Sequence, residues 1–254
     1  MKATIVKVGG KVLEDPAALN SFIESFKAIP GMKWLVHGGG NRATEIAGKL
    51  EIESSFVNGR RVTSKDFLDV AIDTYSGINK RLVALLQFNG ISALGLCGAD
   101  LQLVQAEKRN SQPVDFGFVG DPVNSEIDMA LLDLLLTSEI TPVFSALSYD
   151  PKLGILLNTN ADAVAANLVQ KLSTKVDVEL VIAFEKGGVL MDPEDDSKII
   201  PLIGRNEIAD LKNNGTISQG MLPKMESAVS AIENGASLVR ITSYKALQKG
   251  TIIQ

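Results

Sequence analysis

The sequence predicts an α/β protein whose strands form a mainly parallel sheet. Short runs rich in Val, Ile and Thr alternate with longer segments of helical periodicity, which is the pattern of strand–helix crossover units. Glycine-rich turns follow three of the strand-like runs, at Gly9-Gly10, Gly38–Gly40 and Gly187-Gly188. The 254 residues suffice for one large domain or for two lobes.

The first elements follow from β-forming runs, capping residues and glycine stops. Ala3–Val8 is a predicted strand, and Asp15-Pro16 then supplies a cap and a first-turn proline for a helix that ends near Ala28. Lys33–Val36 is the next strand. It leads through the second glycine turn into a predicted helix over Asn41–Leu50.

The longest helical pattern covers Asp66–Asn89, with apolar residues near one face and Gly90 as its stop. A strand over Ile91–Cys97 follows, and Leu101–Asn124 is rich in Gly, Pro and β-formers, which predicts hairpins at the rim of the sheet. The remaining expected elements, set off by turn and capping residues, are helix Glu126–Glu139, strand Thr141–Tyr149, extended segment Ile155–Leu157, helix Ala161–Leu172, strand Val178–Phe184, helices Asn206–Asn213 and Pro223–Asn234, and strand Leu238–Thr242.

Composition excludes several classes of protein. A single cysteine, Cys97, rules out disulfide frameworks and Cys-rich zinc sites, and a single histidine, His37, rules out HExxH sites. The net charge of −5 argues against non-specific nucleic-acid binding, and no apolar run reaches the roughly 18 residues that a membrane span needs. We therefore expect a cytoplasmic protein without nucleic-acid or membrane partners.

The glycine turns are candidate anion sites, because amides beside a helix N-terminus attract phosphate or carboxylate. The turn at Gly9-Gly10 is not a Walker A loop, since Ile5 stands at its first glycine position and Val12 at its Ser/Thr position. An ordinary P-loop ATPase is thereby excluded. A purely structural role as tight turns is the competing interpretation of each glycine pair.

The segment Gly38–Ala43 satisfies the loose Rossmann pattern GxGxxA between a strand and a helix. A dinucleotide site also needs an acidic residue about 20 residues later, where this chain has Asn58–Thr63. An arginine in that segment would suit a 2′-phosphate. An NADP-binding protein therefore stays open as an alternative.

Two lysines and a polar junction are candidates for chemistry. Lys7 lies in an apolar strand, where an ammonium is costly unless it reaches an anion, and Lys224 near a helix start opposes the helix dipole. Asn158, Asn160 and Asp162 gather polar groups where a strand meets a helix. The competing interpretations are an edge lysine, a surface lysine and simple capping.

The remaining chemically capable side chains point to structural roles. His37 precedes a glycine turn, where a hydrogen-bonded structural histidine is the commoner outcome. Cys97 ends an apolar strand without a cationic neighbour in sequence, so we expect an inert thiol.

Five segments, in this order, resemble one family: Val6–Gly10, Val36–Gly40, Asn58–Thr63, Asn158–Asp162 and Gly220–Lys224. The chain is similar to the N-acetylglutamate kinases of the amino-acid kinase superfamily. With Tyr75–Lys80, Gly117–Gly120 and Gly250-Thr251, the resemblance spans nearly the whole chain. Asn-Gly-x-Arg-Val-Thr followed by Asn-x-Asn-Ala-Asp resembles the acylglutamate branch rather than aspartokinases, carbamate kinases or uridylate kinases.

The resemblance implies a three-layer α/β/α sandwich, the amino-acid kinase fold. Residues 1–173 would form a lobe for acylglutamate binding and dimerisation, and residues 174–254 a lobe for nucleotide binding. The implied activity is ATP-dependent phosphorylation of the γ-carboxylate of N-acetyl-L-glutamate, the second step of arginine biosynthesis. We expect a homodimer without arginine feedback, because the first strand begins at about Ala3 and no helix like that of the hexameric members precedes it.

The resemblance also implies roles for single residues, and it implies Mg²⁺ bound through ATP rather than by protein ligands. Lys7 and Lys224 would offset charge on the transferred phosphoryl group, and Asp162 would orient the lysines. The expected substrate-binding residues are Gly39, Gly40, Arg61, Asn158 and Asn160, with Arg61 on a substrate carboxylate, and the expected phosphate- and ATP-binding residues are Gly9, Gly10, Glu185, Gly187, Gly188, Gly220 and Met221.

The chemistry suits these residues, since a γ-carboxylate with a pKa near ~4.3 is ionised at neutral pH and needs no general base. Two departures from the family pattern stand near the nucleotide. Phe184-Glu185 replaces the usual Thr/Ser-Asp pair, and Pro223 removes a backbone donor. A protein of this fold that binds ligand without catalysis is therefore a further alternative.

The acyl group stays open at this point. Succinyl extends acetyl by a carboxymethyl group, and Arg60, next to the expected carboxylate anchor, could contact such an additional carboxylate. A solvated arginine is the commoner outcome. N-succinyl-L-glutamate is therefore the alternative substrate.

Overall fold

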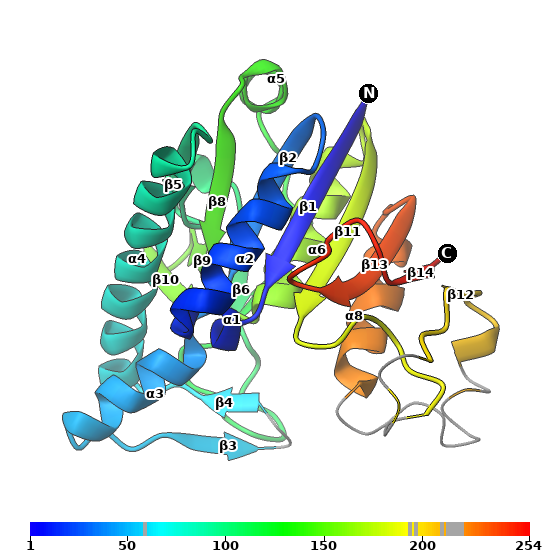
Figure 1. Cartoon of the computed structure of the whole chain (residues 1–254). Helices are drawn as coiled ribbons and strands as arrows, with labels where there is room; N and C mark the ends of the chain where they lie inside the picture. The colour runs from blue at the N-terminus through cyan, green and yellow to red at the C-terminus, as the bar shows by residue number, and fades with distance from the viewer. Residues whose placement is uncertain (58–59, 193–194, 196–197, 209–210, 212–220) are drawn as a thin grey trace. The chain divides into compact units, whose positions relative to one another are not determined.

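The computed structural model describes the whole chain except residues 58–59, 193–194, 196–197, 209–210 and 212–220. The described residues group into two compact units (Figure 1). Unit 1 comprises Met1–Leu35 and Leu168–Gln254, and unit 2 comprises Val36–Asn167. The expected division of roles between residues 1–173 and 174–254 stays a prediction.

Unit 1 is built on a mostly parallel sheet with the strand order β12-β14-β13-β11-β1-β2. β1 pairs in parallel with β11, which pairs in parallel with β13, whereas β14 runs antiparallel to β13. The central strands are almost continuously buried, as parallel strands covered on both faces must be. The bounds are β1 Lys2–Val8, β2 Met32–His37, β11 Asp177–Phe184, β12 Leu202–Ile203, β13 Leu238–Ser243 and β14 Thr251–Ile253.

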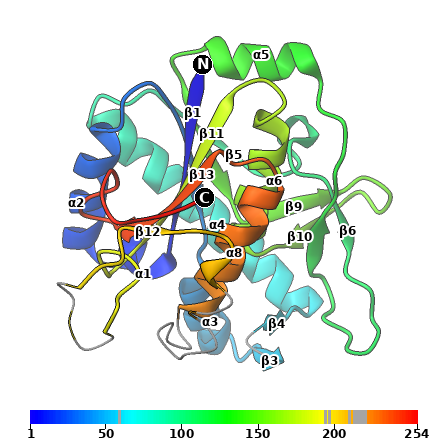
Figure 2. The ribbon, with the colours of Figure 1, turned by 90° about the vertical axis from the view of Figure 1, so that its right-hand side faces the viewer.

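Helices cover both faces of this sheet. α2 (Pro16–Lys27) lies on one face and α8 (Leu222–Glu233) on the other, where α8 packs against β11 and β13 (Figure 2). Unit 1 therefore has three layers. Short α1 (Gly10–Glu14) follows β1, and α6 (Ala161–Leu172) ends in this unit.

The start of α2 follows from its sequence. The Asp15 carboxylate accepts hydrogen bonds from the backbone N–H groups of Ala17 and Ala18, at 2.8 and 3.1 Å, and Pro16 occupies the first turn. Both features satisfy or remove amides that lack partners within the helix. The predicted cap is confirmed.

Unit 2 contains the parallel pair β5–β8 and three antiparallel hairpins. Its long helix α4 packs against α3, β5 and β8 (Figure 1) and buries Phe67, Leu82 and Leu86. The elements are α3 Gly40–Lys49, β3 Ser55–Val57, β4 Arg60–Val62, α4 Lys65–Phe88, β5 Ala93–Leu96, the 3-10 helix Asp100–Gln102, β6 Ala106–Lys108, β7 Gly120–Pro122, α5 Met129–Thr137, β8 Thr141–Ser145, β9 Leu147–Asp150, β10 Ile155–Asn158 and most of α6.

The predicted α/β class is confirmed, and the single strand expected over Thr141–Tyr149 is wrong. β8 ends at Ser145, and β9 begins at Leu147 and pairs with β10. The Ala146 carbonyl between the two strands accepts a hydrogen bond from the Thr159 N–H at 3.1 Å. Every residue from 141 to 148 is buried, so no change of hydrophobic period marks the break.

Other differences concern short elements. The helix expected over Glu126–Glu139 is the shorter α5, because the Asp128 carboxylate caps it by accepting from the Ala130 N–H at 2.8 Å. The strand expected over Ile91–Cys97 is the shorter β5. The helix expected over Asn206–Asn213 lies partly outside the described residues. The sequence did not predict α1, β3, β4, β12 and β14.

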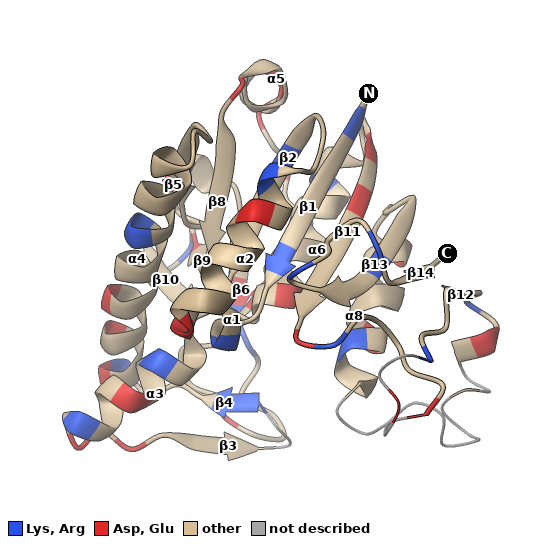
Figure 3. Ribbon diagram, viewed as in Figure 1, with Lys and Arg blue, Asp and Glu red and all other residues tan. Residues whose placement is uncertain are grey.

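Charged side chains of both signs lie along α3, as Figure 3 shows. On that helix Glu45 pairs with Arg42 at 2.5 Å and with Lys49 at 2.6 Å. Such exposed pairs contribute little to stability. No helix among the described residues is both long and apolar enough to cross a membrane.

Candidate functional site

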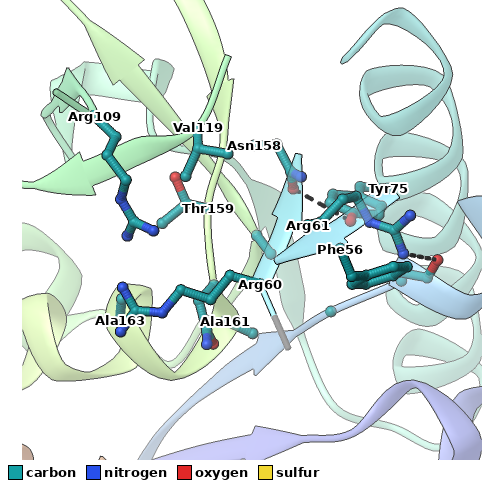
Figure 4. A pocket seen from close by; sticks show the side chains of 15 residues that line it. Phe56, Arg60, Arg61, Tyr75, Arg109, Val119, Asn158, Thr159, Ala161 and Ala163 are labelled. Carbon is teal, nitrogen blue, oxygen red and sulfur yellow. Dashed lines mark hydrogen bonds between the residues drawn. The ribbon is translucent and has the colours of Figure 1, made fainter. Parts of the chain in front are cut away.

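A cavity of about 350 Å³ lies within unit 2 (Figure 4). Its walls come from the turn between β2 and α3, from β4, from α4 and from the junction between β10 and α6. The lining residues are Gly38, Gly39, Gly40, Phe56, Arg60, Arg61, Tyr75, Arg109, Val119, Ala146, Asn158, Thr159, Asn160, Ala161 and Ala163. This volume is within the range of roughly 300–1,000 Å³ usual for small-molecule sites.

The structure brings all five predicted substrate-binding residues to this one cavity: Gly39, Gly40, Arg61, Asn158 and Asn160. Their roles stay predictions. The described lining carries three arginines and no Asp or Glu side chain. The cavity is therefore suited to an anionic small molecule.

The glycine turn forms the cavity wall at the N-terminus of α3. Gly39 is the N-cap residue, and the first turn of the helix directs its amides toward the preceding turn. A Cβ atom on Gly39 would lie 2.7 Å from Cδ1 of Tyr75 and 2.8 Å from Cδ1 of Ile78. The turn therefore needs glycine here because of the close approach of α4.

We expect Gly39→Ala to destabilise the protein by about 1–3 kcal/mol, the usual cost of overpacking, because Tyr75 and Ile78 must move. Gly48 is the matched control within α3, since a Cβ there meets nothing within 4 Å. Gly48→Ala should stabilise the helix by about 0.5–1 kcal/mol. Urea denaturation of both variants measures the difference, and equal unfolding free energies would refute the steric argument.

Arg61 is held rigidly. Its guanidinium lies between the rings of Phe56 and Phe67, 4.4 Å from each ring centre. Nη2 donates to the Thr44 hydroxyl at 2.6 Å, and Nη1 donates to the Ser54 hydroxyl. Burial lowers the pKa of Arg61 from its ordinary value, and the nearby Tyr75 opposes this shift. The side chain is thus positioned before any ligand binds.

Asn158 is fixed by two partners in the same wall. Its Nδ2 donates to the Thr63 hydroxyl at 2.9 Å, and its Oδ1 accepts from the Tyr75 hydroxyl at 3.3 Å. Burial raises the pKa of Tyr75, so this hydroxyl keeps its proton at neutral pH. Tyr75 thus links the glycine turn to Asn158.

The start of α6 brings the other two polar residues of this junction together. The Asn160 Oδ1 accepts from the Asp162 N–H at 2.8 Å, so Asn160 caps the helix. Asp162 is half-buried in the first turn of α6 and is not part of the cavity lining. Its expected role toward the lysines stays a prediction.

Sequence reasoning missed Tyr75, Thr159 and Arg109 as lining residues. Arg109 directly follows β6, where its backbone N–H donates to the Val119 carbonyl at 2.8 Å, and the Asp121 carboxylate on β7 accepts from its Nε at 2.9 Å and from its Nη2. This ion pair raises the pKa of Arg109. Two segments of the family resemblance lie next to these residues: Tyr75–Lys80 begins with Tyr75, and Gly117–Gly120 leads into β7.

His37 is a buried structural residue, as predicted. Nδ1 lies 2.8 Å from the Gly38 carbonyl and Nε2 lies 3.1 Å from Nδ2 of Asn79, so the network assigns the proton to Nδ1. Burial lowers the pKa of His37 to about 4, against the effect of the Gly38 hydrogen bond. A neutral imidazole with both nitrogens occupied does not serve as a general base.

This pKa predicts a loss of stability in mild acid. Because the pKa of His37 is about 4 in the folded state and 6.5 otherwise, the unfolded chain binds a proton first as the pH falls. Stability is unaffected above pH 6.5 and falls by about 3 kcal/mol by pH 4. Urea denaturation from pH 4 to 7 measures this, and His37→Gln should show a shallower pH slope. Equal slopes would contradict it.

In unit 1, two predicted lysines stand near the carboxyl ends of adjacent strands. Lys7 lies in β1 beside Ile182 of β11. Nζ of Lys224, in the first turn of α8, lies 4.9 Å from the centre of the Phe184 ring at the end of β11. Both lysines are half-buried.

The predicted phosphate-binding residues of unit 1 occupy turns. Gly9 is the N-cap residue of α1 and Gly10 its first residue, and Met221 is the buried N-cap residue of α8. A Cβ on Gly187 or Gly188 would lie 2.7 Å from Ile199, which explains the glycine pair sterically. The other predicted residues of this group are Glu185, which is exposed just after β11, and Gly220, which lies outside the described residues.

Metal-ligating side chains do not cluster among the described residues. The half-buried Cys97 has a pKa raised mainly by burial, in line with the predicted inert thiol. The described lining of the cavity offers positively charged side chains and hydrogen-bond donors.

The family model described as the amino acid kinase family matches residues 2–243. The chain is 45% identical over 251 residues to an acetylglutamate kinase of Phocaeicola vulgatus, a match that covers 98% of this chain and 96% of the relative. The similarity therefore extends over nearly the whole length of both chains.

Two solved structures share the fold. N-acetylglutamate synthase from Neisseria gonorrhoeae, complexed with coenzyme A and N-acetyl-glutamate, gives a TM-score of 0.81 at 18% identity and covers 99% of this chain and 59% of its own. Carbamate kinase from Giardia lamblia bound to AMP-PNP gives a TM-score of 0.68 at 13% identity, with 99% and 98% covered. The fold expected from the sequence is confirmed.

Proposed function

The chain belongs to the amino acid kinase family and, within it, to the acetylglutamate kinases, and from this we propose that it phosphorylates the γ-carboxylate of N-acetyl-L-glutamate with ATP. The product is N-acetylglutamyl 5-phosphate, and the reaction serves arginine biosynthesis. The observation that carries the proposal is the cavity of unit 2, with three arginines, a glycine turn and no acidic side chain in its described lining. N-acetylglutamate carries two carboxylates and matches this charge.

The acyl substrate occupies the cavity of unit 2 in this proposal. Arg61 binds the α-carboxylate, because its planar guanidinium suits a carboxylate and its position is fixed by two aromatic rings. Asn158, oriented by Thr63 and Tyr75, binds the amino-acid moiety. The amides at Gly39 and Gly40 lie toward the oxygens that react.

The nucleotide binds to residues of unit 1. Lys7 and the amides of Gly9-Gly10 at the N-terminus of α1 suit the phosphates, as does Lys224 in the first turn of α8. Mg²⁺, held by the nucleotide, offsets phosphate charge. Phe184-Glu185 departs from the family pattern, and the ammonium nitrogen of Lys224 lies 4.9 Å from the centre of the Phe184 ring.

The transfer needs charge stabilisation but no proton transfer. A γ-carboxylate oxygen attacks the γ-phosphorus, the bond to the bridging oxygen of ADP breaks, and no proton is gained or lost at the carboxylate. Phosphoryl transfer depends on positioning and on offsetting negative charge, which lysines and amides supply. The reaction is therefore compatible with a chain whose only histidine is buried and neutral.

The protein acts as a cytoplasmic homodimer in this proposal. β5 is the last strand of its sheet, with Leu94 exposed, and Phe88 at the end of α4 is 86% exposed. Exposed apolar side chains beside a sheet edge favour pairing with another chain. Light scattering after size-exclusion chromatography tests the dimer, and a monomer at micromolar concentration would refute it.

The activity is tested by ADP release with MgATP and, in parallel, N-acetylglutamate, N-succinylglutamate, glutamate, aspartate and UMP. Hydroxylamine traps the acyl phosphate. ADP release that requires an N-acylglutamate supports the proposal. If none of the five acceptors gives ADP release, the proposal is refuted and a ligand-binding protein without catalysis is favoured. Calorimetry would then detect the binding of N-acetylglutamate.

A further inference from the structure

The proposed binding of N-acetylglutamate leaves Arg60 without an anionic partner among the described residues, whereas Arg109 is paired with Asp121. With the α-carboxylate on Arg61 and the γ-carboxylate at the glycine turn, the acetyl group is neutral. Arg60 and Arg109 also line the cavity, and both extend to the side away from the Arg61 guanidinium (Figure 4). Two guanidinium groups therefore line the part of the cavity away from Arg61.

Arg60 is available to a ligand. It neighbours Arg61 in β4, where successive side chains point to opposite faces, so the two arginines address different parts of the cavity. Arg60 is exposed, and it makes no side-chain hydrogen bond or ion pair with the described part of the chain. A surface arginine of this kind normally extends into solvent, whereas this one belongs to a cavity wall.

Arg109 is the fixed member of the pair. Its Nε and Nη2 donate to the Asp121 carboxylate, and its guanidinium lies 5.2 Å from the centre of the Phe116 ring. Its side chain is only 20% exposed. Asp121 is not among the lining residues, so the ion pair orients Arg109 from behind without adding negative charge to the cavity wall.

We infer that Arg60 and Arg109 form a second anion subsite that binds a carboxylate at the end of the acyl group. The inference rests on the proposed function and extends its substrate class to N-acylglutamates whose acyl chain ends in a carboxylate. N-succinyl-L-glutamate is the probe, because it extends acetyl by one carboxymethyl group. Planar guanidinium groups bind carboxylates through paired hydrogen bonds, which makes this subsite selective for charge as well as for length.

The test compares three acceptors with MgATP: N-succinyl-, N-butanoyl- and N-acetyl-L-glutamate. N-butanoyl has the same chain length as N-succinyl without its carboxylate. The wild-type enzyme should prefer N-succinyl over N-butanoyl in kcat/KM. Arg60→Met should lower kcat/KM for N-succinylglutamate by about 10–100-fold, the usual effect of losing a hydrogen bond to a charged group, and leave N-acetylglutamate within about threefold.

Lys152→Met is the matched control, since it removes one exposed positive charge of unit 2 outside the cavity. It should change none of the three values. Calorimetry with N-succinylglutamate and no ATP should show the same loss of affinity in Arg60→Met.

The outcomes separate the two hypotheses. Turnover of N-acetylglutamate with no preference for N-succinyl over N-butanoyl, or equal losses for all acceptors in Arg60→Met, overturns the subsite and leaves the kinase proposal intact. No turnover of any N-acylglutamate by the wild-type protein overturns the kinase proposal, and calorimetry then decides the subsite alone. In that case, unchanged binding of N-succinylglutamate by Arg60→Met in calorimetry refutes the subsite.

Discussion

A Lys224→Met variant is expected to lose about 10²–10³-fold in kcat, the usual loss when one preorganised donor to a charged transition state is removed. Lys224 lies in the first turn of α8, where the helix dipole disfavours a cation, and its Nζ is 4.9 Å from the Phe184 ring centre. Phosphate oxygens beside the ammonium during transfer would offset this unfavourable effect of the helix dipole. Steady-state ADP release with saturating N-acetylglutamate measures kcat.

Two comparisons make this result specific. Binding of N-acetylglutamate should be unchanged in Lys224→Met, because its cavity lies within unit 2 whereas Lys224 belongs to unit 1. Lys27→Met removes an exposed lysine from the last turn of α2 and should keep full activity. A Lys224→Met enzyme with normal kcat would remove Lys224 from the mechanism.

Arg61→Met is expected to raise the KM for N-acetylglutamate by about 100-fold or more, as losing one partner of a buried charge pair does. The methionine keeps much of the packing between Phe56 and Phe67 but donates no hydrogen bond. Arg61→Lys should recover little, because an ammonium lacks the planar pair of donors. Initial rates over a range of N-acetylglutamate concentrations, with ATP saturating, measure both variants.

A general disturbance of the folded structure could also weaken the binding of N-acetylglutamate. The KM for ATP is therefore the control. The KM for ATP should stay within about threefold in both variants if the units bind their ligands separately, and urea denaturation reports the folded fraction. Equal rises in both KM values would indicate a structural role for Arg61. An unchanged KM for N-acetylglutamate would exclude it as the carboxylate anchor.

The fold was predictable where local sequence and burial agree. The bounds of α6 match the expected helix over Ala161–Leu172, and Asp15 with Pro16 correctly marked the start of α2. The short elements were not predictable, because two or three residues carry too little periodicity. Helix α1 begins at a glycine, a poor helix former, so its propensity argued against it.

The site was predictable in part. The family resemblance selected five residues that line one cavity, from three separate segments of the chain. It did not select Arg109, whose approach depends on the pairing of β6 with β7 and on the ion pair with Asp121. No spacing in the sequence reveals that pairing, since the two strands are short and the segment between them is irregular.

The discontinuity of unit 1 has a consequence for protein synthesis. β1 is made before unit 2, and its parallel partner β11 leaves the ribosome only after the whole of unit 2. At a synthesis rate of roughly 5–20 residues per second, the edge of β1 that pairs with β11 stays open for about ten seconds or longer. Unit 2, by contrast, is continuous in sequence and can fold as soon as it emerges. The newborn chain thus carries an apolar strand with β2 as a neighbour on one edge and its other edge open, which is the segment that a chaperone would shield.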